Sequence, residues 1–213
     1  MFILDLSTNQ IHGKIPNWIW KIGNGSLSSL NLSLNFLEDP DQPWPVNSFQ
    51  SLDEIDLHSN KLKGNNLILP STSFEYLDYS FNNLTSLIPN ISSYFSNMNM
   101  FFSVSNNQIN GEIPASICEA DRLEYLDLSN NKMSGPIPPC LGNGTSLSVL
   151  NLRGNNFQGI IPDAFAESCD LKTLDLSANR LSGQLPRSLA NCTALKFLDV
   201  GNNRLSGTFP SWL

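Results

Sequence analysis

An asparagine recurs at near-constant intervals along the whole chain and divides it into nine units. The eight intervals measure 26, 25, 22, 25, 24, 24, 24 and 24 residues. A fixed period of this length is typical of a stack of small structural units, each of which buries its apolar face only against its neighbours. The recurring asparagines are Asn9, Asn35, Asn60, Asn82, Asn107, Asn131, Asn155, Asn179 and Asn203.

Apolar side chains stand five and three positions before each of these asparagines. Because alternate residues of a strand point to the same face, this spacing predicts one short strand per unit with one buried face. The full phrase, for example LDLSNNKMSGPIP from Leu126, is that of a leucine-rich repeat. We therefore expect a leucine-rich-repeat solenoid of the α/β horseshoe type with about nine repeats. A parallel β-sheet would form its concave face, with short 3-10 turns and extended segments on the convex side.

Two further columns follow the asparagine in most units. Glycine stands four positions after it in seven of nine units, which indicates backbone with positive φ. Proline stands seven positions after it in seven of nine units, which favours extended chain over a long helix. The asparagine amide can satisfy backbone groups where the chain leaves the strand, so stacked units should form an asparagine ladder.

Length and charge exclude several classes of function. The 213 residues fit a single leucine-rich-repeat domain, 1–213, which we expect to be truncated at both ends, without caps, signal peptide or transmembrane segment. A net charge of −7 argues against nucleic acid and an anionic membrane surface as partners. No His/Cys cluster indicates a metal site, and no cofactor is predicted.

Glycosylation motifs and cysteines point to a secretory route. Asn-x-Ser/Thr motifs begin at Asn24, Asn31, Asn83, Asn90, Asn143 and Asn191, although Asn31 belongs to the ordinary sequence of the strand. Asn143 and Asn191 are the better candidates for glycosylation, because both lie in the same loop position of their units. Four cysteines fall in successive units, where equivalent backbone lies close enough for the disulfides Cys118–Cys140 and Cys169–Cys192. Four free buried thiols are the alternative.

Longer stretches of sequence point to a more specific family. The stretches PPCLGNGTSLSVLNLRGNNFQGIIPDAFAESCDLKTLDLS from Pro138 and SLANCTALKFLDVGNNRLSGTFPSWL from Ser188 resemble ectodomains of plant receptor-like proteins of the wilt- and mould-resistance class. The resemblance implies an interior block of an ectodomain at the extracellular face of the plasma membrane. It also implies recognition of an extracellular peptide or protein in defence or development, and signalling through a partner receptor kinase.

Ligand contacts are expected among strand residues that point away from the leucines. One such column is rich in exposed aromatic residues, which protein interfaces favour. The residue between the two strand leucines is acidic in six of nine units, which predicts a negative stripe. The candidate ligand-binding patch is Tyr76, Phe101, Tyr125, Asp127 and Arg153.

Two other functions remain open, and catalysis is disfavoured. A secreted inhibitor of cell-wall-degrading enzymes would use the same repeat, and an inactive truncated gene product is the third alternative. His12 and His58 are lone histidines in different columns, with no nucleophile arranged beside them. The acidic column stands on an open face with nothing to raise the pKa of a carboxyl. The chain is therefore predicted not to be an enzyme.

Overall fold

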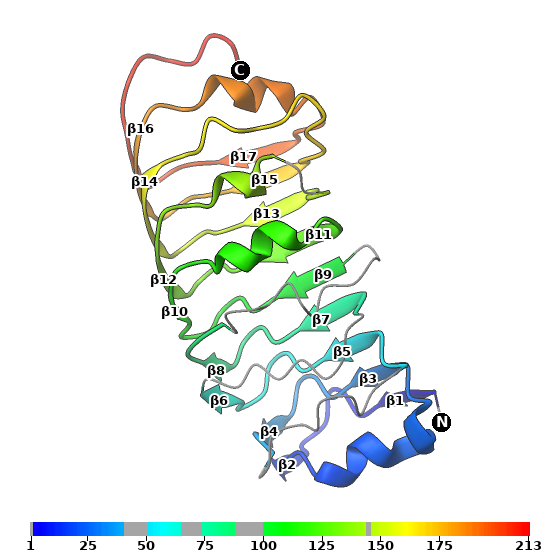
Figure 1. The fold of residues 1–213 in the computed structure, drawn as a ribbon. Coiled ribbons are helices and arrows are strands. Elements are labelled where there is room, and N and C mark those ends of the chain that lie inside the picture. The colour runs from blue at the N-terminus through cyan, green and yellow to red at the C-terminus, as the bar shows by residue number, and fades with distance from the viewer. Residues whose placement is uncertain (1, 41–50, 65–73, 88–99, 144–145) are drawn as a thin grey trace.

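The chain forms an elongated stack of coils in which each coil adds one strand to a common sheet (Figure 1). This computed structural model describes residues 2–40, 51–64, 74–87, 100–143 and 146–213. Among them, no helix is both long enough and apolar enough to cross a bilayer. The predicted leucine-rich-repeat solenoid is confirmed.

The main sheet holds nine parallel strands in chain order, one for each predicted unit. Its register pairs equivalent residues, so that Leu126 lies beside Leu150 and Leu150 beside Leu174. The face predicted to be concave, opposite these leucines, is called the sheet face below. The strands are β1 (Ile3–Asp5), β3 (Ser29–Asn31), β5 (Glu54–Asp56), β7 (Tyr76–Asp78), β9 (Met100–Ser103), β11 (Leu123–Asp127), β13 (Val149–Asn151), β15 (Thr173–Asp175) and β17 (Phe197–Asp199).

The periodic leucines form one continuous core behind this sheet. Leu126 and Leu128 are 0% and 1% exposed, whereas Leu6 in the first unit is 37% exposed. The difference arises because an inner unit has a neighbour on both sides and the first unit has one.

The asparagine ladder forms as predicted. Asn131 Nδ2 donates to the carbonyls of Val104, Leu128 and Ser129 at 3.0–3.1 Å, and its Oδ1 accepts the Ile109 N–H at 3.0 Å. One buried side chain thus satisfies four backbone groups in its own and the preceding unit. The same set of bonds recurs at Asn60, Asn82, Asn107, Asn155 and Asn179.

A second set of short strands follows the asparagines, where we predicted extended chain without a sheet. Extended segments in successive coils lie side by side, so they pair as well. The bends predicted from the glycine column are present, for example at Gly135 with φ 83°. The strands are β2 (His12–Lys14), β4 (Phe36–Glu38), β6 (Lys63–Gly64), β8 (Asn83–Leu84), β10 (Asn110–Gly111), β12 (Lys132–Gly135), β14 (Asn156–Ile160), β16 (Arg180–Gly183) and β18 (Arg204–Leu205).

Short 3-10 helices lie where helical turns were expected. Pro114, Pro138 and Pro186 directly precede three of them in extended conformation. The described helices are η1 (Asn17–Gly25), η3 (Ala115–Glu119), η4 (Pro139–Leu141) and η5 (Arg187–Asn191). The unit of Phe165 departs from this pattern, because its described residues 163–170 form turns and bends although Phe165 itself is buried.

Two disulfides join adjacent coils on this side of the stack. Cys118 is bonded to Cys140 with a Cα–Cα distance of 5.4 Å, and Cys169 is bonded to Cys192 with a distance of 4.6 Å. These are the two pairs that the spacing favoured over free thiols.

Candidate ligand-binding face

Three aromatic rings stack across adjacent strands of the sheet face. The register aligns Tyr76 on β7 with Phe101 on β9, and Phe101 with Tyr125 on β11. The ring centroids of Tyr76 and Phe101 are 4.5 Å apart with planes at 9°, and those of Phe101 and Tyr125 are 4.2 Å apart at 20°. The structure therefore brings three of the five predicted site residues together. We call this group the ring stack.

The ring stack presents edges rather than faces to a ligand. Its centroid spacing is close to the roughly 4.8 Å between neighbouring strands, so the rings stack along the sheet with their faces toward one another. Both faces of Phe101 are covered by the two tyrosine rings. Aromatic edges carry partial positive charge and suit oxygen acceptors such as peptide carbonyls.

The two phenols of the ring stack stay protonated at physiological pH. Burial raises the pKa of Tyr76, and the negative charge of Asp78 raises it further. Burial likewise raises the pKa of Tyr125, with a smaller contribution from Asp127. Tyr76 Oη donates a long hydrogen bond of 3.4 Å to Asp78 Oδ2. Both hydroxyls therefore remain neutral hydrogen-bonding groups.

Charged residues are distributed unevenly around the ring stack. Glu54 stands directly before Tyr76 in the same column and is exposed, and so are Asp53 and Glu75. Beyond the stack, the exposed Lys172 and Lys196 come directly before the column residues Thr173 and Phe197. At the start of the strands, the sheet face is therefore acidic on the β5–β7 side of the stack and basic on the β15–β17 side, although Asp175 and Asp199 stand at the ends of β15 and β17.

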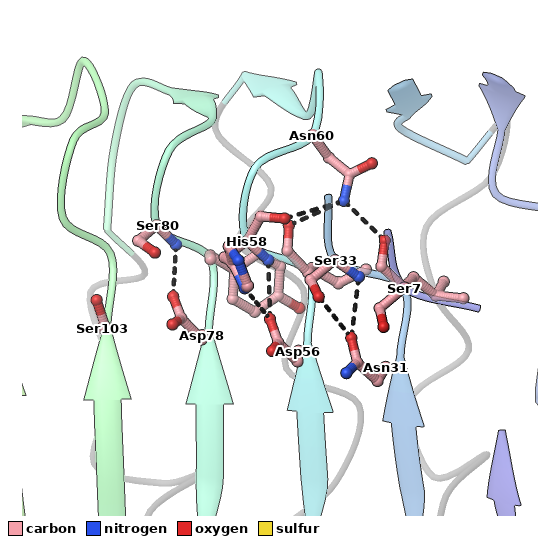
Figure 2. A network of polar contacts seen from close by, with 12 residues as sticks. Ser7, Asn31, Ser33, Asp56, His58, Asn60, Asp78, Ser80 and Ser103 are labelled. Carbon is pink, nitrogen blue, oxygen red and sulfur yellow. Dashed lines mark hydrogen bonds and ion pairs between the residues drawn. The ribbon is translucent and has the colours of Figure 1, made fainter. Parts of the chain in front are cut away.

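Asp127 does not form the exposed contact that was predicted. It is 9% exposed, its Oδ1 accepts the Ser129 N–H at 2.8 Å, and its Oδ2 accepts Asn151 Nδ2 at 3.1 Å. An aspartate or asparagine binds the N–H two residues ahead in the same way in seven other units, at Asp5, Asn31, Asp56, Asp78, Asn151, Asp175 and Asp199. Figure 2 shows these bonds at Asn31, Asp56 and Asp78.

The acidic column is thus a series of strand-end turns more than an open negative stripe. The expectation that nothing there raises a carboxyl pKa was wrong, because burial raises the pKa of Asp78 and of Asp127. The local turn explains the error, since it covers a short side chain that a strand alone would leave exposed.

Arg153 is exposed but stands apart from the ring stack. It lies four residues beyond Val149, the residue that pairs with Tyr125. Its backbone N–H donates to Asn151 Oδ1 at 3.2 Å. Arg153 therefore extends the basic side of the sheet face and does not contribute to the aromatic centre.

Two exposed apolar residues were missed by the sequence analysis. Leu34 and Phe81 have φ of 53° and 55° and are 46% and 57% exposed. Bulky residues rarely adopt this left-handed conformation, which costs about 1–2 kcal/mol. The signal was available, since the position directly before the ladder asparagine elsewhere holds Thr8, Ser59, Asn106, Asn130, Gly154, Ala178 and Asn202.

His58 is not isolated in the fold, although it is a lone histidine in the sequence. Its Nδ1 lies 2.7 Å from Asp56 Oδ1, and Asp78 on the next strand completes a close group (Figure 2). The prediction of no metal site considered histidines and cysteines and overlooked these aspartates.

The structure distinguishes glycosylation motifs with an exposed asparagine from motifs whose asparagine side chain is hydrogen-bonded. Asn83 and Asn143 are exposed, whereas Asn191 Nδ2 donates to the Phe165 carbonyl at 2.9 Å and Asn31 Oδ1 accepts from Ser33. Asn90 lies outside the described residues, and so does the side chain of Asn24.

Comparison with known sequences supports the predicted family. Profiles of leucine-rich repeats match residues 2–22, 122–143 and 145–205. Receptor-like protein 7 of Arabidopsis thaliana is 39% identical over 112 residues, which are 53% of this chain and 11% of that protein. The matched part of this chain therefore spans about a tenth of that relative's length.

Solved structures with the same fold bind different partners. A plant ice-binding protein matches with a TM-score of 0.81 at 28% identity, over 98% of this chain and 66% of its own. The Arabidopsis receptor kinase HAESA, solved with the peptide hormone IDA and the co-receptor SERK1, matches with a TM-score of 0.59 at 27% identity. That match covers 99% of this chain and 47% of HAESA. The prediction that this chain is not an enzyme agrees with the receptor relatives.

Proposed function

This chain is a leucine-rich-repeat protein of the plant receptor-like type, and from that premise we propose that its sheet face binds an extracellular peptide or protein. The ring stack of Tyr76, Phe101 and Tyr125 is the observation that carries the proposal. Half-buried aromatic residues in register over three strands form a rigid apolar surface, and such residues provide much of the affinity in protein interfaces.

The orientation of the rings favours a peptide over a carbohydrate. Sugars bind aromatic residues mainly by lying on a ring face, and both faces of Phe101 are covered. Ring edges and two neutral hydroxyls instead suit an extended main chain, whose carbonyls accept and whose amides donate hydrogen bonds.

The uneven charge of the sheet face would orient the bound ligand. Glu54 and Glu75 would attract basic residues of the ligand at the β5–β7 side, while Lys172 and Lys196 would attract acidic residues at the β15–β17 side. A peptide crossing the strands would therefore bind in one orientation.

The protein context follows from the family. The chain would lie at the extracellular face of the plasma membrane, in a receptor that senses a defence elicitor or developmental signal and acts through a receptor-kinase co-receptor. The structure of HAESA with a peptide hormone and a co-receptor supports this part of the proposal, because HAESA has the same fold.

An inhibitor of cell-wall-degrading enzymes remains the alternative, with an inactive gene product as the third. A basic enzyme would find complementary negative charge only on the β5–β7 side of the sheet face. Because the same fold also occurs in an ice-binding protein, fold similarity by itself does not select among these functions.

Binding of a random peptide library to the complete ectodomain tests the proposal. We expect Phe101→Ala to weaken the selected peptides at least about tenfold, the effect of losing a central aromatic contact. Phe197→Ala is the matched control, because Phe197 occupies the same column, is 48% exposed and lies on β17 outside the stack. Equal effects of the two substitutions, with both variants folded, would reject the ring stack as the binding centre.

We also propose glycosylation at Asn83 and Asn143, whose side chains are exposed. Asn191 is disfavoured, because a glycan would displace its bond to the Phe165 carbonyl. Mass spectrometry of peptides from the plant-expressed protein should find glycans at the first two and unmodified Asn191. A fully occupied Asn191 would contradict this selection.

A further inference from the structure

One unit departs from the repeat at a position on the sheet face. Two places after the last residue of each main-sheet strand, which is aspartate or asparagine in eight units and Ser103 in the fifth, six of nine units have serine, at Ser7, Ser33, Ser80, Ser105, Ser129 and Ser177. The third unit has His58 there. Since the repeat does not require a histidine at this position, the imidazole is a feature of this unit's surface and not of the fold.

His58 lies between two carboxylates of neighbouring strands. Its Nδ1 is 2.7 Å from Asp56 Oδ1, and one ligand atom from each of Asp56, His58 and Asp78 lies within 4.8 Å of the others. The residues that flank the two aspartates on the neighbouring strands are uncharged. They are Asn31 on β3, beside Asp56, and Ser103 on β9, beside Asp78. Among the residues that the structure describes, this is the one such group of three.

A backbone amide bonds one oxygen of each carboxylate, and the Ser80 side chain also hydrogen-bonds Asp78. Asp56 Oδ1 accepts the His58 N–H at 3.1 Å, and Asp78 Oδ1 accepts the Ser80 N–H at 2.7 Å. No backbone amide bonds the second oxygen of either residue in the described structure, although Asp78 Oδ2 accepts the long bond from Tyr76. Outer-shell hydrogen bonds of this kind orient metal ligands in known sites.

We propose that Asp56, His58 and Asp78 bind a divalent transition metal ion of the zinc class. One imidazole nitrogen and two carboxylate oxygens are ligands that Zn²⁺ accepts, and three protein ligands leave a fourth position open. Bonds of about 2.1 Å in tetrahedral geometry place ligand atoms about 3.4 Å apart. This lies between the present 2.7 Å from His58 Nδ1 to Asp56 Oδ1 and the 4.8 Å within which the three ligand atoms lie, so the ion requires small side-chain movements in both directions. Two carboxylates and a neutral imidazole carry a charge of −2, which the ion would neutralise.

A second aspartate pair in the same columns serves as an internal comparison. Asp175 and Asp199 lie side by side on β15 and β17, as Asp56 and Asp78 do on β5 and β7. The positions equivalent to His58 are Ser177 and Gly201, so that pair lacks a nitrogen ligand. If adjacent aspartates alone attracted the ion, both pairs would bind it. The proposal requires binding at the first pair only.

Isothermal titration calorimetry of Zn²⁺ binding to the full chain, after a chelator has removed bound metal, tests the site. We expect one bound ion, and at least about a tenfold loss of affinity in His58→Ala and in Asp78→Asn. His12→Ala is the matched control, because His12 is exposed and its Nδ1 lies 3.4 Å from the Gln10 carbonyl, away from any carboxylate of the proposed site. Co²⁺ should give a visible absorption band that His58→Ala abolishes.

Three results would overturn the proposal. They are no binding by the wild-type chain, equal affinity in wild type and His58→Ala, or the same loss in His12→Ala. Circular dichroism would establish that each variant is folded. Peptide binding measured with chelator present tests the ring stack separately, so failure of one proposal leaves the other standing.

Discussion

Among the described residues, the two halves of the stack share the main sheet but differ in their second strands and disulfides. From β10 onward the units repeat at 24 residues, their second strands join in one five-stranded sheet, and both disulfides lie there. In the first half the described second strands form two separate pairs, β2–β4 and β6–β8. The main sheet nevertheless runs unbroken through both halves. The leucines and the asparagine ladder therefore build the main sheet even where the described second strands do not join in one sheet.

Independence of the two sides has a consequence for function. Units that differ in length and in the pairing of their second strands still present their sheet-face residues in register, so this face can vary residue by residue. We call the part before β10 the irregular half and the part from β10 onward the regular half. The two unusual groups on the sheet face, His58 with its aspartates and the ring stack, both begin in the irregular half. Four predictions test how far the halves are equivalent.

Removing a ladder asparagine should have the largest effect, and it should be equal in both halves. Asn82 and Asn155 each accept one backbone N–H and donate to three carbonyls. We expect Asn82→Ala and Asn155→Ala each to lower the free energy of unfolding by about 4 kcal/mol, because buried groups lose their partners. Urea unfolding measures this. Asn110 is an exposed control whose side chain donates to the Thr85 carbonyl, and Asn110→Ala should cost less than about 1 kcal/mol.

A clearly smaller loss at Asn82 than at Asn155 would show that the irregular half does not depend on the ladder in the same way.

Removing a disulfide should destabilise the regular half alone. The Cys118–Cys140 bond closes a loop with a separation of 22 residues. Its loss in the double variant Cys118→Ser/Cys140→Ser should cost about 3 kcal/mol, through the greater freedom of the unfolded chain. Hydrogen exchange should show reduced protection in β11 and β13 with little change in β3 and β5. Uniform loss across all strands would mean that the halves unfold as one unit.

Relieving the left-handed strain should stabilise the irregular half. Phe81→Asn replaces a bulky residue at φ 55° by the type found at the equivalent Asn106 and Asn130. We expect a gain of about 1 kcal/mol in thermal or urea unfolding. Ala178→Asn in the regular half is the control and should change less. Loss of stability in Phe81→Asn would indicate that the exposed ring makes contacts that outweigh the strain.

The smallest expected effect is a change in pH dependence at Asp127. Burial raises the pKa of its carboxyl above the usual range. The folded chain therefore binds this proton more readily than the unfolded chain, and the residue favours folding increasingly as pH falls through the folded-state pKa. Asp127→Asn, which still accepts the Ser129 N–H, should remove this contribution. Relative to the variant, the wild type should gain less than about 1 kcal/mol between pH 7 and pH 4.

Urea midpoints at the two pH values measure this difference. An identical pH dependence in the variant and the wild type would show that the carboxyl is effectively solvated.

Local pattern made most of the fold predictable. Alternating leucines specify a strand with one buried face, and the asparagine and glycine columns mark where the chain turns. Because every unit carries the same pattern, its register with the next unit follows from the period. Counting residues from the ladder asparagines was enough to place Tyr76, Phe101 and Tyr125 in one column. It was also enough to pair the cysteines.

Tertiary structure decided what those aligned side chains do. The strand-end turn covers Asp127, and the stacking of the tyrosine rings covers the faces of Phe101. His58 meets Asp78 across two strands, 20 residues apart in the sequence. Counting residues places side chains in columns, but their exposure and contacts depend on packing between neighbouring coils, and only the folded stack fixes that.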